Sequence, residues 1–292
     1  MAGHLVITAD DFGLAPEVND AVEFAHRDGV LSAASLMVTG SAAGHAVTLA
    51  RRMPTLRVGL HVVLVDGEPA SPPEFIPDLV DSGGRLRGDM IALAFNFALR
   101  PKIRRQLERE IAAQFEAFRK TGLALDHVNA HKHFHLHPVI GGHVVALAQH
   151  YGCRALRVPS EPAWVVGGAR WSPAQAVTAP WIALLRRRAC SAGLPTPDAV
   201  FGLAWSGAMT AERLRTLLVR LPDGLVEIYT HPATANSFRG HAPGYRYADE
   251  LAALTDPDVK ALVRRCGLRP SGYLDAPSCA NDLATSASSQ LA

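Results

Sequence analysis

The feature that most constrains the fold is a regular alternation of two kinds of segment along the 292 residues. Short apolar runs alternate with amphipathic stretches whose apolar positions recur at helical spacing. Strands that are apolar along their whole length are typical of parallel sheets covered by helices. The predicted strands are Leu5–Ala9, Ala34–Val38, Val58–Val63, Asp126–Ala130, Ala155–Val158, Val200–Ala204 and Gly224–Tyr229.

The amphipathic stretches fall between these strands, which favours a (β/α) barrel. We therefore expect an α/β protein whose distorted barrel has about seven parallel strands, similar to a TIM barrel. A doubly wound open sheet is the alternative, because periodicity does not reveal whether a sheet closes. The predicted helices are Pro16–Arg27, Ala42–Arg52, Lys102–Lys120, Val139–His150, Thr210–Arg220 and Tyr247–Arg265.

Two segments interrupt the alternation, and a third follows it. Residues 66–100 combine Pro and Gly with the apolar run Ile91–Leu99, and residues 161–193 are rich in Trp and Arg. Beyond residue 275 the composition is small and polar, which is typical of disorder. The sequence thus predicts a single catalytic domain over residues 1–275, with insertions at about 66–100 and 161–193, and a disordered tail over 276–292.

Composition narrows the class of partner and the compartment. The formal net charge is only +2 and no long basic run occurs, which argues against nucleic acid. The four cysteines are widely spaced without a CxxC pair, which fits a reducing compartment. The first apolar run lacks a basic leader, and no apolar stretch reaches membrane-spanning length. We expect a cytoplasmic enzyme. The sequence leaves open whether the enzyme contacts the inner face of the membrane peripherally and whether it forms a homodimer.

Histidines are concentrated in one short block that reads HVNAHKHFHLHP. Imidazole is a usual ligand of zinc and similar ions, and burying several without partners would be costly. At a strand period of two, His131, His133 and His135 would project to one side. An exposed His-rich loop is the ordinary alternative. The block contains His127, His131, His133, His135 and His137.

Position strengthens the case for a site, although each motif alone has an ordinary explanation as a cap or a core residue. Six residues fall at C-terminal ends of predicted strands: Asp10, Asp11, His61, His131, Arg157 and His231. In a barrel these ends form one mouth, where catalysis takes place. Carboxylates, imidazoles and a cation converging there indicate metal-assisted hydrolysis. A two-metal phosphoesterase or amidohydrolase would need a further carboxylate, and a lipid or glycan carrier would need no general base.

The sequence resembles the YdjC-like (ChbG-type) carbohydrate deacetylases in four motifs. They are ADDFG at Ala9–Gly13, GLH at Gly59–His61, HxHxH within His131–His135 and THPA at Thr230–Ala233. The resemblance extends from Leu5 to about Leu274. It implies a (β/α) barrel, distantly similar to NodB-type polysaccharide deacetylases, that hydrolyses the N-acetyl groups of sugars.

The resemblance also implies a role for each matched residue. Asp11, His61 and His131 would bind one divalent metal ion. Asp10 would be the general base and His231 the general acid.

Further roles are implied around this set. Arg157 would orient the general base, and His133, His135 and Trp164 are candidate substrate-binding residues. Relatives often carry Asp two residues before the first histidine of the cluster, where this chain has Asn129, so the orienting role of that carboxylate is in doubt. One carboxylate and two imidazoles favour zinc or a similar transition metal and leave magnesium open.

Within the family, the HKHFHLHP block and the Trp/Arg-rich segment at 161–193 resemble the hopanoid-biosynthesis-associated branch, HpnK. That branch implies a lipid-linked substrate, N-acetylglucosaminyl bacteriohopanetetrol, with chito-oligosaccharides as the alternative. Arg186–Arg188 would suit a membrane surface, whereas simple packing as a lid is an equally good interpretation of both insertions. The aromatic residues that could contact the lipid are Phe95, Phe97, Trp164, Trp171 and Trp181.

Overall fold

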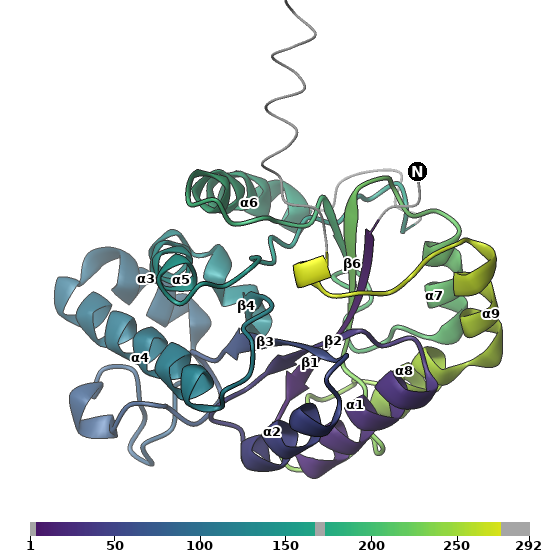
Figure 1. Ribbon diagram of the computed structural model, residues 1–292. Helices are drawn as coiled ribbons and strands as arrows, with labels where there is room; N and C mark the ends of the chain where they lie inside the picture. Colours follow the sequence, from purple (N-terminus) through teal and green to yellow (C-terminus); the bar gives the residue numbers. More distant parts are fainter. Residues whose placement is uncertain (1–3, 167–172, 276–292) are drawn as a thin grey trace, which may run out of the picture.

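One curled sheet of six parallel strands organises the described part of the protein (Figure 1). The computed structural model describes residues 4–166 and 173–275, and of residues 173–176 the backbone alone. The predicted tail at 276–292 and Trp171 lie outside the described residues. The strand order is β4-β3-β2-β1-β6-β5. The strands are β1 (His4–Phe12), β2 (Ala33–Leu36), β3 (Arg57–Val62), β4 (Val128–Ala130), β5 (Ala199–Phe201) and β6 (Leu225–Thr230).

The sheet is a half-barrel, and the prediction of about seven strands is wrong. The segment expected to be a further strand, Ala155–Val158, forms only an isolated bridge between Leu156 and Val128 of β4. On its other side, the amide of Val200 in β5 donates to the carbonyl of Ser160 at 2.9 Å. The residue after this segment is a proline, which has no N–H to continue a ladder. The segment therefore spans the gap between the edge strands without completing a TIM barrel.

Helices surround the outside of this sheet (Figure 1). Helices α1, α7, α8 and α9 lie together beside β1 and β6, and α3, α4 and α5 lie beside β3 and β4. Residues at helical spacing on their inner faces are buried, as the sequence pattern predicted. The helices are α1 (Pro16–Asp28), α2 (Ala43–Arg52), α3 (Met90–Leu99), α4 (Pro101–Lys120), α5 (Pro138–His150), α6 (Pro173–Ser191), α7 (Ala211–Leu218), α8 (Tyr247–Thr255) and α9 (Pro257–Arg265).

The single helix expected at Tyr247–Arg265 is two helices. The break lies at Asp256, whose ψ of 128° is extended, because the proline that follows disfavours a helical residue before it. The Asp256 carboxylate then accepts the amide of Val259 at 2.9 Å and caps α9. The part of the chain that the structure describes also contains the 3₁₀ turns η1 (Pro73–Phe75), η2 (His131–Leu136) and η3 (Tyr273–Asp275).

Both insertions contribute a helix that packs on α5. Helix α3 of the first insertion contacts α4 and α5, and α6 of the second contacts α5 and η2. Phe97 is 1% exposed inside this packing, so it belongs to the core and does not present a surface to a lipid. No helix in the described ranges is both long and apolar enough to cross a membrane.

Strands β3 and β4 approach closely at Gly59. A Cβ added there would lie 2.5 Å from the His127 ring and 2.5 Å from the His127 carbonyl oxygen. Real Cβ contacts are essentially never so short, so only glycine allows this ring to lie beneath β3. The glycine of the GLH motif thus has a packing role that the sequence alone did not assign.

We expect Gly59→Ala to lower the free energy of unfolding by about 1–3 kcal/mol, because the inserted methyl overpacks the β3–β4 contact. The measurement is urea unfolding followed by circular dichroism. Gly44→Ala is the matched control, since nothing lies within 4 Å of a Cβ at that helical position. Equal stability of the two variants would contradict the packing role of Gly59.

Candidate active site

The two adjacent aspartates diverge because the backbone changes conformation between them. The pairing of β1 with β2 shifts register between Ala9 and Phe12, and Asp11 has a left-handed φ of 63°. Asp is among the non-glycine residues that tolerate this region best. As a result the Asp10 carboxylate meets Arg157, whereas the Asp11 carboxylate meets His61 and His131.

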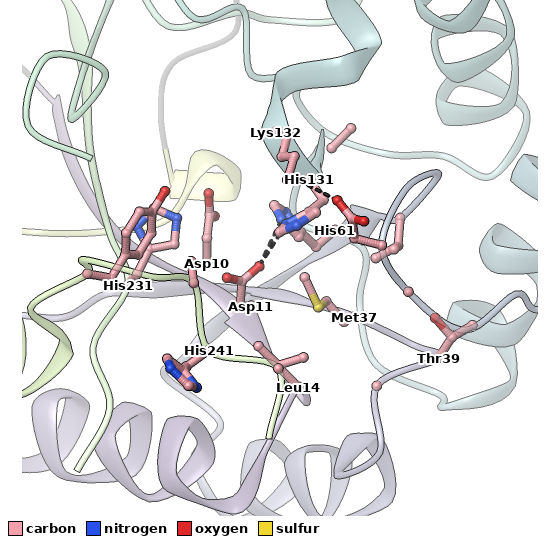
Figure 2. A pocket seen from close by; sticks show the side chains of 18 of the residues that line it. Asp10, Asp11, Leu14, Met37, Thr39, His61, His131, Lys132, His231 and His241 are labelled. Atoms are coloured by element: carbon pink, nitrogen blue, oxygen red, sulfur yellow. Dashed lines mark hydrogen bonds and ion pairs between the residues drawn. The ribbon is translucent and has the colours of Figure 1, made fainter. Parts of the chain in front are cut away.

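Asp11, His61 and His131 converge as expected from their places at strand ends. Asp11 Oδ1 lies 3.3 Å from His61 Nε2 and 3.2 Å from His131 Nδ1. One ligand atom from each residue lies within 4.8 Å of the others, and these three are the only such group of His, Cys, Asp and Glu within 4–166 and 173–275. Figure 2 shows the Asp11 carboxylate facing the two imidazoles. One carboxylate and two imidazoles fit a divalent transition metal.

The charges around this group also suit a cation. Burial alone would lower the pKa of His61, but the carboxylates of Asp10 and Asp11 outweigh burial and raise it. Burial would likewise raise the pKa of Asp11, but His131 and His61 hold it well below its usual range. The Asp11 carboxylate is therefore ionised, and the surroundings of His61 favour positive charge.

A buried ion-pair network holds Asp10. Arg157 is fully buried and binds Asp10 through two N–H···O bonds of 2.5 Å and 3.0 Å. The same guanidinium binds Glu227 through bonds of 2.9 Å and 2.6 Å. Although burial would raise the pKa of Asp10, Arg157 and His61 depress it far below the usual value. Sequence reasoning associated Arg157 with Asp10 but missed Glu227, whose only signal was a charge in the middle of an apolar strand.

The histidine block does not continue β4, and the expected period of two is wrong there. It forms η2, in which Lys132 and His133 have left-handed φ values of 53° and 52°. His131 and His133 line the pocket, whereas His135 is buried behind them with Nε2 2.8 Å from the Arg157 carbonyl. Burial lowers the pKa of His133 well below its usual value and that of His135 to about 4, so both rings are neutral.

His231 lies across the two aspartates from the His61 and His131 pair (Figure 2). Its ring is in edge contact with Tyr229 and Tyr245, at centroid distances of 5.6 Å and 5.1 Å. The backbone amide of His231 donates to the carboxylate of Glu250, which fixes the residue at the end of β6. Its Nδ1 has no hydrogen-bond partner within the part of the chain that the structure describes. The His231 residue also lines the pocket.

One pocket of about 500 Å³, a size usual for small-molecule sites, is lined by Asp10, Asp11, His61, His131, His133 and His231, whereas Arg157, Glu227 and His135 lie outside its lining. The first insertion contributes Asp66, Glu68 and Arg85 to the pocket wall. The described residues of the second insertion are not among the lining residues, and Trp164 is 66% exposed outside the wall. The loop at 239–245, which follows the THPA motif, also lines the pocket and carried no signal in the sequence.

Comparisons with known proteins agree on one family. The model of the YdjC-like protein family matches residues 4–265. A carbohydrate deacetylase of Geobacillus stearothermophilus is 32% identical over 278 residues, which cover 94% of this chain and 98% of that protein. A chitooligosaccharide deacetylase of Salmonella schwarzengrund is 29% identical over 277 residues, with coverage of 93% and 98%.

A solved structure has the same fold along nearly the whole chain. The crystal structure of a proposed cellobiose-phosphate cleavage protein of Enterococcus faecalis V583 superposes with a TM-score of 0.75 at 27% identity. The match covers 95% of this chain and 100% of that one. The curled arrangement of strands is thus shared with a relative.

We expect Arg157→Met to lower the free energy of unfolding by about 3–5 kcal/mol at pH 7, because two buried carboxylates lose their shared cation. In the native protein, the depressed pKa of Asp10 stabilises the fold at any pH above the pKa that Asp10 has in the unfolded chain. This stabilisation is lost as the pH falls from there towards the folded pKa. In the variant, burial would instead raise the pKa of Asp10 in the folded state, so Asp10 would become protonated as the pH falls from 7 to 5. The stability deficit of Arg157→Met relative to the native protein should therefore be smaller at pH 5 than at pH 7.

Urea unfolding at both pH values measures this deficit. Arg52→Met is the control, since that arginine is 62% exposed and its ion pair with Glu23 is 3.5 Å long. A deficit of Arg157→Met that is the same at both pH values would indicate lost packing rather than unpaired carboxylates.

Proposed function

The chain belongs to the YdjC-like family, and from its site we propose that it is a metal-dependent hydrolase that removes the N-acetyl group of an amino sugar. The observation that carries the proposal is the division between the two aspartates. Asp11 faces two imidazoles, and Asp10 faces Arg157 on the other side of the backbone. Such a pair separates a metal ligand from a general base within one pocket. We assign this activity to residues 1–275.

We propose that Asp11, His61 and His131 bind one divalent ion. The donor set favours zinc or a similar transition metal, because two imidazoles are unusual around the harder magnesium ion. When bound, the ion supplies Lewis-acid chemistry, which polarises the acetyl carbonyl and acidifies water. That chemistry complements Asp10, whose depressed pKa keeps it ionised but makes it a weak base on its own.

The protein's own residues would then manage the protons. Asp10, held by Arg157, accepts a proton from the water that attacks the acetyl carbonyl. His231, on the far side of Asp10, donates a proton to the departing nitrogen. The products are acetate and a free amine. His133 is neutral and lines the pocket, so it is our candidate for contact with the sugar.

Two other functions fit the site less well. A two-metal phosphoesterase or amidohydrolase needs a bridging carboxylate, but Glu227 is already occupied by Arg157, Thr8 and Tyr273. Binding of two metal ions per chain would revive that alternative. A carrier of lipid or glycan would not need the Asp10–Arg157 pair.

We propose further that the sugar is lipid-linked, as N-acetylglucosaminyl bacteriohopanetetrol, and that the protein contacts the membrane peripherally. Support comes from exposed apolar side chains on α3, where Ile91, Phe95 and Leu99 are 72%, 65% and 75% exposed. Their four-residue spacing places them on one helix face. Helices α3 and α6 both pack on α5, and Trp181 of α6 is 43% exposed. Exposed apolar groups of this kind suit a lipid tail.

We expect Asp10→Asn to lower kcat by about 10²–10⁴-fold while zinc remains bound, because the variant loses the base but keeps all three ligands. Acetate release gives the rate, and elemental analysis gives the metal content. Asp28→Asn, which changes an exposed carboxylate on α1, is the control. Retained turnover in Asp10→Asn would exclude Asp10 as the base, and loss of zinc would place it among the ligands.

We expect zinc-loaded protein to remove an acetyl-sized mass from N-acetylglucosaminyl bacteriohopanetetrol. Removal of the zinc with a chelator should abolish the reaction. Chitobiose is tested in parallel by mass spectrometry. Reaction with chitobiose alone would keep the deacetylase and exclude the lipid-linked substrate. No reaction with either, across zinc, cobalt, nickel and magnesium, would contradict the proposed activity.

A further inference from the structure

A row of buried polar side chains extends from the pocket towards the C-terminal turn η3. We call it the buried polar network, and its members are Asn129, Ser35, His127 and Asp126. All four are fully buried. Asn129 contacts both His61 and Asp10 at one end, and Asp126 accepts the amides of Tyr273 and Leu274 at the other.

The ionised Asp10 carboxylate determines how the Asn129 amide is oriented. Asp10 Oδ1 can only accept, so the group that faces it at 3.2 Å must be the Asn129 amide nitrogen. The second hydrogen of that nitrogen goes to Ser35 Oγ at 2.9 Å. Asn129 Oδ1 is then left facing His61 Nδ1 at 2.6 Å, and that nitrogen must donate. The proton of a neutral His61 therefore lies on Nδ1, and Nε2 has a free lone pair.

For a neutral His127, the rest of the network has one consistent set of donors and acceptors. Ser35 accepts from Asn129, so its own hydroxyl proton points to His127 Nε2 at 3.0 Å. His127 Nε2 thus accepts, and Nδ1 donates to Asp126 Oδ2 at 2.9 Å. Asp126 is an acceptor only, which matches the two backbone amides it also receives. Every donor in the series points away from Asn129 towards Asp126.

The Ser35–His127–Asp126 geometry resembles that of a nucleophilic triad, but no substrate can reach it. Ser35 is fully buried, and its lone pairs already receive the Asn129 amide. A nucleophile needs an exposed oxygen in a cleft. These residues therefore act through Asn129 and not on a substrate.

We infer that Asp126, His127, Ser35 and Asn129 are positioning residues that hold the proton of His61 on Nδ1 and so keep Nε2 free to bind the metal ion. The inference rests on the proposed metal site. A ligand histidine whose second nitrogen donates to an acceptor has a fixed tautomer and ring orientation. Here the acceptor is the Asn129 amide oxygen, and the NH₂ group of the same amide donates to Asp10. A carboxylate at position 129 could accept from His61 but could not donate to Asp10.

The direction of the network predicts a specific effect at its remote end. Asp126→Asn presents an NH₂ group that can donate to His127 Nδ1, which would move the His127 proton to Nε2. The Ser35 hydroxyl would then lose its acceptor and favour rotation of the Asn129 amide, whereas ionised Asp10 still favours the amide nitrogen facing it. The population would therefore shift towards a rotated amide that donates to His61 Nδ1 and leaves the His61 proton on Nε2, the nitrogen that faces Asp11.

We expect Asp126→Asn to weaken zinc binding at least about tenfold, measured by competition with a chelating dye. Ser35→Ala cuts the network, so in that background Asp126→Asn should change zinc affinity by no more than about twofold, the usual scatter for independent sites. Asp275→Asn is the control for loosening of η3, because Asp275 accepts a backbone amide in the same turn. An equal loss from Asp126→Asn in both backgrounds would overturn the inference.

Long-range ¹H–¹⁵N correlation of the metal-free native protein tests the direction separately from metal binding, and it also serves if Asp126→Asn does not fold. We expect His127 to be neutral, with its proton on Nδ1. A proton on Nε2, or a doubly protonated ring, would overturn the inference. The native protein could instead bind no zinc while His127 has the expected proton. In that case the proposed metal-dependent function fails, and the inferred role of the network in metal binding fails with it. The direction of the hydrogen bonds in the network would still stand.

Discussion

The fully buried guanidinium of Arg157 is the interaction on which the site depends. A buried arginine is tolerable only when its donors are satisfied, and Asp10 and Glu227 together accept four of its hydrogen bonds. The Tyr229 ring lies 4.8 Å away and covers the cation. Because Arg157 keeps Asp10 ionised, Asp10 can in turn orient the amide of Asn129. The Asp10–Arg157 ion pair thereby influences His61, which Asn129 also contacts.

Two hydrogen-bonded routes leave Asp10 and meet at Tyr273. One passes through Arg157 and Glu227 to the Tyr273 hydroxyl, and the other follows the buried polar network to the Tyr273 backbone amide. The turn η3 is therefore tied to the floor of the pocket, although it is distant in sequence. Buried polar groups that are all paired rigidify their surroundings, which suits the proposed arrangement of a metal ion and a base in fixed positions.

Some of this architecture could be predicted, and the failures have identifiable causes. Strand β1 was recognisable because its run Leu5–Ala9 is buried and apolar apart from Thr8, and Asp10 and Asp11 come directly after that run. The strand expected at Ala155–Val158 failed because a proline interrupts the ladder that periodicity assumes. The histidine block failed as a strand because Lys132 and His133 adopt left-handed conformations that no hydrophobic pattern reports.

The sequence alone determined the family, the alternation of strands and helices, and the grouping of Asp11, His61 and His131, because these depend on local pattern and on the rule that strand ends meet. Only the tertiary structure decided the number of strands, the partner of Arg157 in Glu227, and the row from Asn129 to Asp126. Those features are contacts between residues far apart along the chain, as in the bond from Asn129 to Ser35, which are 94 positions apart. Hydrogen-bond direction depends on which atoms face each other across the sheet, and no spacing along the chain carries that information.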